Sequence, residues 1–133
     1  MLAKSRQAGA APFKEGMRAL VGAVAVAVAQ EADGCPAGLT ATAVCSLSVE
    51  PPSLLICVNR SSTIAQALRE GEPFSVNVLA EDQLDIAQAF GGQKPAKGSA
   101  RFAYGSWIRS AHDVPLLMDA RVSFECVVEK VMD

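Results

Sequence analysis

The chain has 133 residues, and half of them are hydrophobic, which suits one domain with a substantial core. A net charge of −2 and scattered lysines and arginines argue against nucleic acid as the main partner. Aromatic residues make up 5% of the chain, too few for a platform on which bases stack.

The cysteine pattern and the N-terminal region indicate a cytoplasmic protein without metal. The four cysteines contain no C-x-x-C pair and only one histidine accompanies them, so a zinc site is not expected. We expect Cys45, Cys57 and Cys126 to be buried free thiols in a reducing compartment. The uncharged run 19–29 is too short to span a bilayer, which needs about 20 residues. Glu15 before it and its many alanines also argue against a signal peptide.

The chain divides into a loose N-terminal arm, residues 1–12, and one domain, residues 13–133. In chain order we expect a helix over 13–20, strands over 21–30, 38–49 and 53–59, a helix over 61–69, a strand over 74–79, a helix over 81–90, a polar loop over 91–98 and a strand over 121–131. Residues 101–108 fit no single pattern. Several strands with few short helices predict a mostly β fold, a barrel decorated by short helices.

The expected strands differ in how they are buried. Residues 21–30 alternate valine and alanine, which predicts a strand with both faces covered, as in a small barrel. Pro51 and Pro52 fix a short bend, so strands 38–49 and 53–59 should pair antiparallel. Strand 121–131 alternates apolar with polar residues, which predicts one wet face.

Hydroxyl side chains recur along the second strand. Thr40, Thr42, Ser46 and Ser48 are all even-numbered, so they share one face if no bulge intervenes. Small residues between them would let a flat ring approach the backbone closely. The alternative is a strand face that simply meets water.

A second polar cluster spans the start of a helix. Asn59, Arg60, Ser61, Ser62 and Thr63 leave a strand and enter the helix, where free backbone N–H groups and the helix dipole favour a phosphate. The alternative is that one serine merely caps the helix, as serines commonly do.

The sequence contains no convincing catalytic dyad. His112 is the only histidine, and the segment 110–113 lacks the G-x-S-x-G context of a serine nucleophile, so a surface loop histidine is the simpler interpretation. Gly91 and Gly92 lack the G-x-G-x-x-G pattern of a dinucleotide fold.

Taken together, these motifs resemble the flavin reductase-like family, whose fold is the FMN-binding split barrel. The segments that carry the resemblance read Gly-Leu-Thr-Ala-Thr-Ala from 38, Ser-Leu-Ser-Val-Glu-Pro-Pro from 46, Cys-Val-Asn-Arg-Ser-Ser-Thr from 57, Phe-Ser-Val-Asn-Val-Leu from 74 and Ala-Phe-Gly from 89. The resemblance covers about residues 13–131. It implies a homodimeric antiparallel split barrel that binds FMN, or FAD, near the dimer interface.

The resemblance also implies which residues bind the cofactor. They are Thr40, Ala41, Thr42 and Ala43 at the ring and ribityl chain, Ser46, Leu47 and Ser48 nearby, Asn59, Arg60, Ser61, Ser62 and Thr63 around the phosphate, and Phe90 and Gly91 beside the ring. NAD(P)H would reduce the flavin, and an oxygenase component would receive it. The cofactor supplies the reactivity, so no side chain has to act as an acid or base.

The chain also departs from the family's pattern. Members usually continue to a Gly-x-His segment on a final strand that borders the nicotinamide, and we expect the domain to lack that last strand. Val114 stands where the family often has glycine before Pro115. Two other functions stay open: a flavin-binding protein for storage or electron transfer without reductase activity, and a barrel that binds no flavin.

Overall fold

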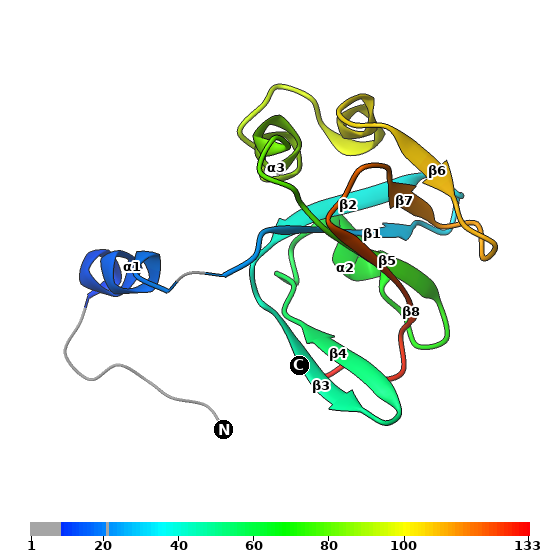
Figure 1. The fold of residues 1–133 in the computed structure, drawn as a ribbon, viewed down its shortest axis with the longest axis horizontal. Helices are drawn as coiled ribbons and strands as arrows, with labels where there is room; N and C mark the ends of the chain where they lie inside the picture. The colour runs from blue at the N-terminus through cyan, green and yellow to red at the C-terminus, as the bar shows by residue number, and fades with distance from the viewer. Residues whose placement is uncertain (1–8, 21) are drawn as a thin grey trace.

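The computed structural model describes residues 9–20 and 22–133, and its elements are arranged around one antiparallel sheet (Figure 1). The elements are α1 (Ala10–Arg18), β1 (Ala25–Gln30), β2 (Pro36–Ala41), β3 (Val44–Val49), β4 (Pro52–Ile56), α2 (Thr63–Ala67), β5 (Pro73–Val78), α3 (Leu84–Phe90), the 3-10 helix η1 (Gly98–Ala103), β6 (Trp107–Arg109), β7 (Pro115–Leu117) and β8 (Val122–Val127). The predicted mostly β, antiparallel fold with short helices is confirmed. Among the described residues the strands form three hydrogen-bonded sheets and no single closed barrel.

The central sheet has the strand order β2-β1-β5-β8, with every neighbouring pair antiparallel. Residues Ala25 to Ala29 of β1 are at most 2% exposed, so β1 is covered on both faces, as its valine–alanine alternation predicted. The small alanines and the branched valines point to opposite sides, and each side has its own core.

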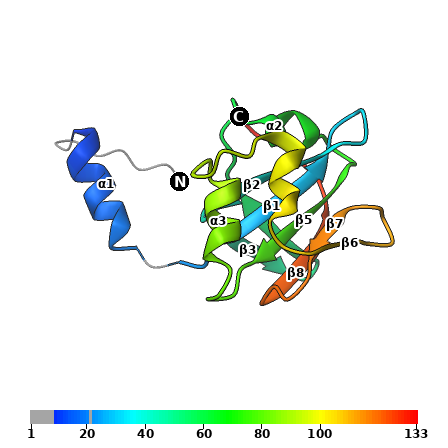
Figure 2. The same cartoon turned by 90° about the horizontal axis from the view of Figure 1, so that it is seen from above.

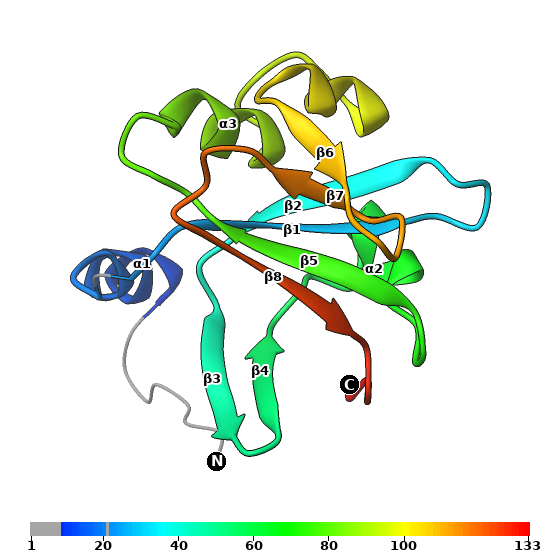
Figure 3. The same ribbon diagram turned by 45° about the vertical axis from the view of Figure 1, so that its right-hand side comes forward.

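The two cores lie on opposite faces of the sheet (Figure 3). On the alanine face, Ala27 and Val76 pack with Ile64 of α2, and partly buried residues of the β3–β4 hairpin complete this core. On the valine face, Val28 packs with Phe90 of α3, beneath η1 and the β6–β7 hairpin. Covering both faces fixes the position of α2 and α3 relative to β2, which lies between them.

The predicted strand 38–49 is two strands, not one. β2 pairs with β1, whereas β3 pairs with β4, and the chain turns between them where Val44 N–H donates to the carbonyl of Thr42. The β3–β4 register also shifts between Ser46 and Ser48. The expectation of one continuous hydroxyl face from Thr40 to Ser48 is therefore wrong, because the strand leaves one sheet and enters another.

The bend at the two prolines is as expected. β3 and β4 are antiparallel, and the Glu50–Pro51 peptide bond between them is cis. The hairpin extends beyond the central sheet (Figure 3), which leaves Cys45 and Cys57 exposed. The prediction that these two thiols are buried is therefore wrong. Cys126 is half-buried, and burial raises the pKa of its thiol.

Helix boundaries differ from the predictions at several ends. α1 begins at Ala10, so residues 10–12 of the expected arm are helical, while residues 1–8 lie outside the described part. The ambiguous segment 101–108 contains the end of η1, a turn and the start of β6. The strand expected over 121–131 ends at Val127. The predicted alternation of buried apolar and wet polar residues is wrong for this strand, because Val122 and Phe124 are exposed whereas Ser123 is half-buried and its hydroxyl donates to the buried Asn77.

A buried polar network joins four strands on the valine face. The Asn77 side chain is fully buried, and its Nδ2 donates to the Val26 carbonyl at 3.1 Å and to Ser75 Oγ at 3.0 Å. Its Oδ1 accepts from Leu117 N at 3.0 Å and from Ser123 Oγ at 2.8 Å. One amide therefore ties β1, β7 and β8 to β5 with all its hydrogen-bonding capacity used.

Candidate functional site

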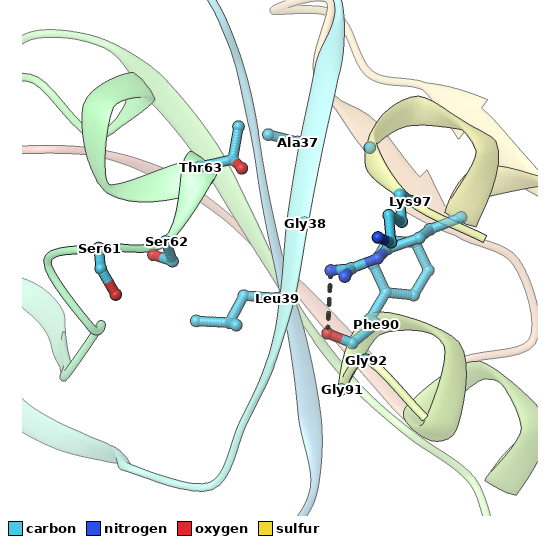
Figure 4. Close-up of a pocket in the computed structure, with 12 residues that line it drawn as sticks. Ala37, Gly38, Leu39, Ser61, Ser62, Thr63, Phe90, Gly91, Gly92 and Lys97 are labelled. Carbon is cyan, nitrogen blue, oxygen red and sulfur yellow. Dashed lines mark hydrogen bonds between the residues drawn. The ribbon is translucent and has the colours of Figure 1, made fainter. Parts of the chain in front are cut away.

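A cavity of about 390 Å³ lies across β2, with α2 on one side and the end of α3 with η1 on the other (Figure 4). The cavity is lined by Ala37, Gly38, Leu39, Ser61, Ser62, Thr63, Phe90, Gly91, Gly92, Lys97, Gly98 and Arg101. β2 is the outer strand of its sheet and pairs only with β1 among the described residues. Backbone N–H and C=O groups on its open edge are thus available to a ligand.

A close approach between β2 and α3 forms the floor of the cavity. Gly38 faces the Phe90 ring, and a Cβ at Gly38 would lie 2.6 Å from Phe90 Cε1, too close for any side chain. The Phe90 ring is fully buried and packs edge-on against Phe102 at 5.0 Å and Trp107 at 5.5 Å between ring centres. The aromatic cluster therefore fixes the end of α3 against β2.

Asn59 orders the hydroxyl-bearing side of the cavity. Its Oδ1 accepts from Ser61 N at 3.0 Å and from Ser61 Oγ at 2.9 Å, and its carbonyl accepts from Ser62 Oγ at 2.6 Å. Ser62 occupies the N-cap position of α2, but its side chain makes no capping hydrogen bond. Ser61, Ser62 and Thr63 line the cavity where the loop that Asn59 holds in shape enters α2.

Two cationic side chains border the opposite side. Arg101 is half-buried, and its guanidinium donates to the carbonyls of Phe90 at 3.5 Å and Ala96 at 3.3 Å. Lys97 is exposed and precedes η1. Figure 4 shows Lys97 on the Phe90 side of β2, across the strand from Ser62 and Thr63, and Arg101 lines the same cavity. This arrangement offers positive charge and neutral donors to one anionic group.

The structure brings some of the predicted cofactor residues to this cavity and leaves others outside its lining. Ser61, Ser62, Thr63, Phe90 and Gly91 line it. Outside the lining lie Thr40, Ala41, Thr42, Ala43, Ser46, Leu47, Ser48, Asn59 and Arg60. Thr40 nevertheless lies at its border, because its Oγ1 donates to the Ala87 carbonyl at 2.8 Å and its Cβ is 3.8 Å from a Cβ placed on Gly91.

Arg60, the cation expected at a phosphate, is directed elsewhere in this structure. Its side chain is 78% exposed and forms an ion pair with Asp133 at 3.1 Å. Lys97 and Arg101 did not stand out in the sequence, where they belong to a polar loop and an ambiguous segment. Their only signal was a spacing of four residues shortly after Gly91 and Gly92.

The segment around His112 is not arranged for nucleophilic catalysis. Ser110 Oγ donates to Glu125 Oε1 at 2.8 Å, and His112 Nδ1 contacts the same carboxylate oxygen. These hydrogen bonds, that of Ser110 first, hold the pKa of Glu125 below its usual value. The serine proton is directed at the carboxylate and not at the imidazole, so these residues form no serine–histidine dyad. His112 is 70% exposed, as expected for a loop histidine.

No helix within residues 9–20 and 22–133 is long and apolar enough to cross a membrane. Over the same ranges, no three His, Cys, Asp or Glu side chains gather closely enough to hold a metal ion.

Comparison with known proteins identifies the family. The model of the flavin reductase like domain matches residues 17–133. FMN reductase (NADH) RutF 1 of Methylorubrum extorquens is 44% identical over 117 residues, which are 88% of this chain and 57% of that protein. The chain thus spans a little over half the length of such curated relatives.

Solved structures agree with the sequence match. A candidate flavin reductase from Haemophilus somnus 129PT superposes with a TM-score of 0.83 at 29% identity, over 92% of this chain and 77% of that one. The styrene monooxygenase flavin reductase from Pseudomonas putida S12 gives a TM-score of 0.76 at 26% identity, over 91% of this chain and 76% of that one. The sequence match and the shared fold both show that the chain belongs to the flavin reductase-like domain family.

Proposed function

We propose that this domain binds FMN, or FAD, in the cavity across β2 and takes part in its reduction by NAD(P)H. The observation that carries the proposal is the lining of the cavity. Hydroxyl groups on one side and two cations on the other meet over an open strand edge, in a chain of the flavin reductase-like family. The cavity's volume, about 390 Å³, falls in the range of small-ligand sites, roughly 300–1,000 Å³.

The donor set fits the flavin's phosphate. A phosphate needs several donors and a positive charge. Thr63 supplies a hydroxyl group, the hydroxyl groups of Ser61 and Ser62 would turn from Asn59 to the ligand, and Lys97 supplies an ammonium group across the strand. Arg101 adds a second charge, although its guanidinium also supports the Phe90 and Ala96 carbonyls. Lys97 and Arg101 thus join the phosphate-binding residues expected from the sequence.

The remainder of the flavin would extend along β2 beyond Leu39. Thr40 and Ala41 continue this strand, and Thr42 and Ala43 form the turn that follows it. Small side chains here let a planar ring approach the backbone. The predicted roles of residues 40–43, 46–48, Asn59 and Arg60 stay part of this proposal.

The chemistry demands little of the protein beyond placement. A bound flavin supplies the hydride acceptor. The chain's own residues hold the phosphate, align the ring through β2 and exclude water with the buried Phe90 cluster. None of them has to exchange a proton, which is consistent with the arrangement around His112.

The relatives' names guide the finer assignments. RutF 1 is called an FMN reductase that uses NADH, and one structural neighbour is the flavin reductase of a styrene monooxygenase. We accordingly propose FMN with NADH as the first pair to test, reduced flavin as the product passed to a separate oxygenase, and a cytoplasmic homodimer as the working form.

The phosphate assignment is tested by titrating the chain with FMN and with riboflavin, which lacks the phosphate, and following flavin absorbance and fluorescence. A hydrogen bond to a charged group contributes about 1.5–3 kcal/mol. Lys97→Gln should therefore weaken FMN binding about ten- to a hundredfold and leave riboflavin binding unchanged. Lys94→Gln, in the same loop but outside the lining, is the matched control.

Arg60→Ala separates the two cationic candidates. Because Arg60 is paired with Asp133 outside the cavity, we expect the Arg60→Ala substitution to weaken FMN binding less than Lys97→Gln does. Equal losses of FMN and riboflavin affinity in Lys97→Gln would reject the phosphate site. NADH and NADPH oxidation with added FMN then separates a reductase from a protein that only binds flavin.

A further inference from the structure

The helix α3 is held against the strand β2 at two points. Figure 2 shows α3 and η1 side by side over β2 and β1. Gly38 and Thr40 are two residues apart on β2, so they share one face of the strand. Ala87 and Phe90 are three residues apart on α3, so they share one side of the helix. Gly38 meets the Phe90 ring, and Thr40 Oγ1 donates to the carbonyl of Ala87 at 2.8 Å. Two contacts along one helix fix its direction as well as its position.

The hydrogen bond from Thr40 ends on a carbonyl in the last turn of α3. The last four carbonyl groups of a helix have no further turn to bind and need other partners. The Ala87 carbonyl accepts from the N–H of Gly91, the residue that follows the helix, at 3.0 Å, and Thr40 gives it a second donor. The Phe90 carbonyl accepts from Arg101. The end of α3 is therefore held by side chains from β2 and from η1.

This end of the helix is also a wall of the proposed flavin cavity. Phe90 and Gly91 line the cavity, whereas Thr40 lies behind them and outside the lining. The space between the two is closed, because a Cβ on Gly91 would lie 2.9 Å from the Ala87 carbonyl oxygen and 3.8 Å from Thr40 Cβ. A hydroxyl group has one hydrogen, and that of Thr40 is directed at Ala87. The side chain of Thr40 thus supports the wall and does not donate to a ligand.

We propose that Thr40 is a positioning residue of the flavin site. Its hydroxyl holds the last turn of α3 against β2 and thereby fixes the part of the cavity wall that Phe90 and Gly91 form. Small displacements of the groups that place a ligand are costly, so the wall has to be held. The inference rests on the proposed flavin function and deepens it, because it gives the Thr40 side chain a role through α3 and not in contact with the flavin.

Flavin titration tests whether the hydroxyl matters. Thr40→Val keeps the shape of the side chain and suits a strand, but it removes the hydrogen bond to Ala87. The dissociation constants of FMN and of riboflavin should rise together, about two- to tenfold, because the wall is disturbed and the phosphate donors are not. Thr40→Ser keeps the hydroxyl and should bind both flavins as the wild type does. Ser123→Ala removes another hydroxyl hydrogen bond of 2.8 Å, outside the lining, and is the matched control that should change neither constant.

Amide hydrogen exchange of the flavin-free chain separates positioning from direct contact. The N–H of Gly91 shares the Ala87 carbonyl with Thr40, so it should exchange about two- to tenfold faster in Thr40→Val. Thr40→Ser should restore the wild-type rate, and Ser123→Ala should not alter it. Circular dichroism checks that each variant is folded, and Thr40→Ala, which also lacks the hydroxyl, replaces Thr40→Val if that variant misfolds.

Two results would overturn the proposal. Lost flavin affinity with unchanged exchange at Gly91 would show that the hydroxyl contacts the flavin itself. Faster exchange with unchanged affinity for both flavins would show a bond that serves the fold alone. A wild type that binds neither flavin would reject the proposed function and this role with it, whereas faster exchange in Thr40→Val would still show that the hydroxyl holds α3.

Discussion

The buried amide of Asn77 allows a quantitative test of the fold. In Asn77→Ala, the Leu117 N–H loses its only acceptor in the network and cannot turn toward water, and the Val26 carbonyl loses a donor. A buried unsatisfied group costs about 1–3 kcal/mol, and each lost hydrogen bond costs about 1 kcal/mol net. The hydroxyl groups of Ser75 and Ser123 can rotate to other partners, Ser75 already donating to the Pro115 carbonyl at 2.7 Å.

We therefore expect Asn77→Ala to lower the free energy of unfolding by about 3 kcal/mol, out of a total of about 5–15 kcal/mol for a typical domain. In thermal unfolding this corresponds to a fall in Tm of roughly 10 °C for a chain of this size. The loss should be nearly independent of pH, because no titratable group is added.

Asn77→Asp separates the hydrogen bonds from simple packing, because its shape is nearly unchanged. The oxygen that replaces Nδ2 would face the Val26 carbonyl, which is compatible only when the new carboxyl is protonated. Burial raises the pKa of such a carboxyl, although the donors on Oδ1 oppose this in part. Below the pKa of this carboxyl in the unfolded chain, about 3.9, the carboxyl is protonated in both the folded and the unfolded state, so the variant loses little stability.

Above that value the unfolded chain releases the proton while the folded chain keeps it. Stability should then fall by up to about 1.4 kcal/mol per pH unit until the pH reaches the folded pKa. Urea unfolding of the wild type and both variants between pH 4 and 8 measures this. An Asn77→Asp variant as stable as the wild type at pH 7, or one without pH dependence, would refute the role assigned to the network.

Two more predictions test other parts of the structure. Gly38→Ala places a methyl group 2.6 Å from the Phe90 ring and should cost about 1–3 kcal/mol in thermal unfolding, whereas Gly16→Ala, whose Cβ meets nothing within 4 Å, should cost nothing. A Gly38→Ala protein as stable as the Gly16 control would contradict the tight contact. The folded-state pKa of Glu125 is lowered, so its stabilising effect exists above its ordinary pKa and disappears as the pH falls through the folded value. The urea midpoint of Glu125→Gln should therefore lie below that of the wild type at pH 7 and converge with it in acid. A difference between the two urea midpoints that stays constant with pH would show that the charge of Glu125 does not contribute to stability.

The sequence by itself determined the features that depend on local pattern. The valine–alanine alternation of residues 25–29 showed a strand buried on both faces, since successive side chains of any strand point to opposite sides. The two prolines at 51 and 52 predicted an antiparallel hairpin, because a short bend permits no other pairing. The motifs from Gly38 to Thr63 were specific enough to indicate the family that the comparisons show.

Only the tertiary structure decided what depends on distant segments meeting. Thr42 lies in a break because β2 and β3 pair with different partners, and no local pattern reports which partner a strand chooses. Lys97 borders the cavity while Arg60 pairs with Asp133, because the packing of α3 and η1 over β2 sets which cation reaches which space. The alternation of side chains along a strand fixes the face of the sheet on which each side chain lies. Which cavity that side chain faces is set by elements far away in the sequence.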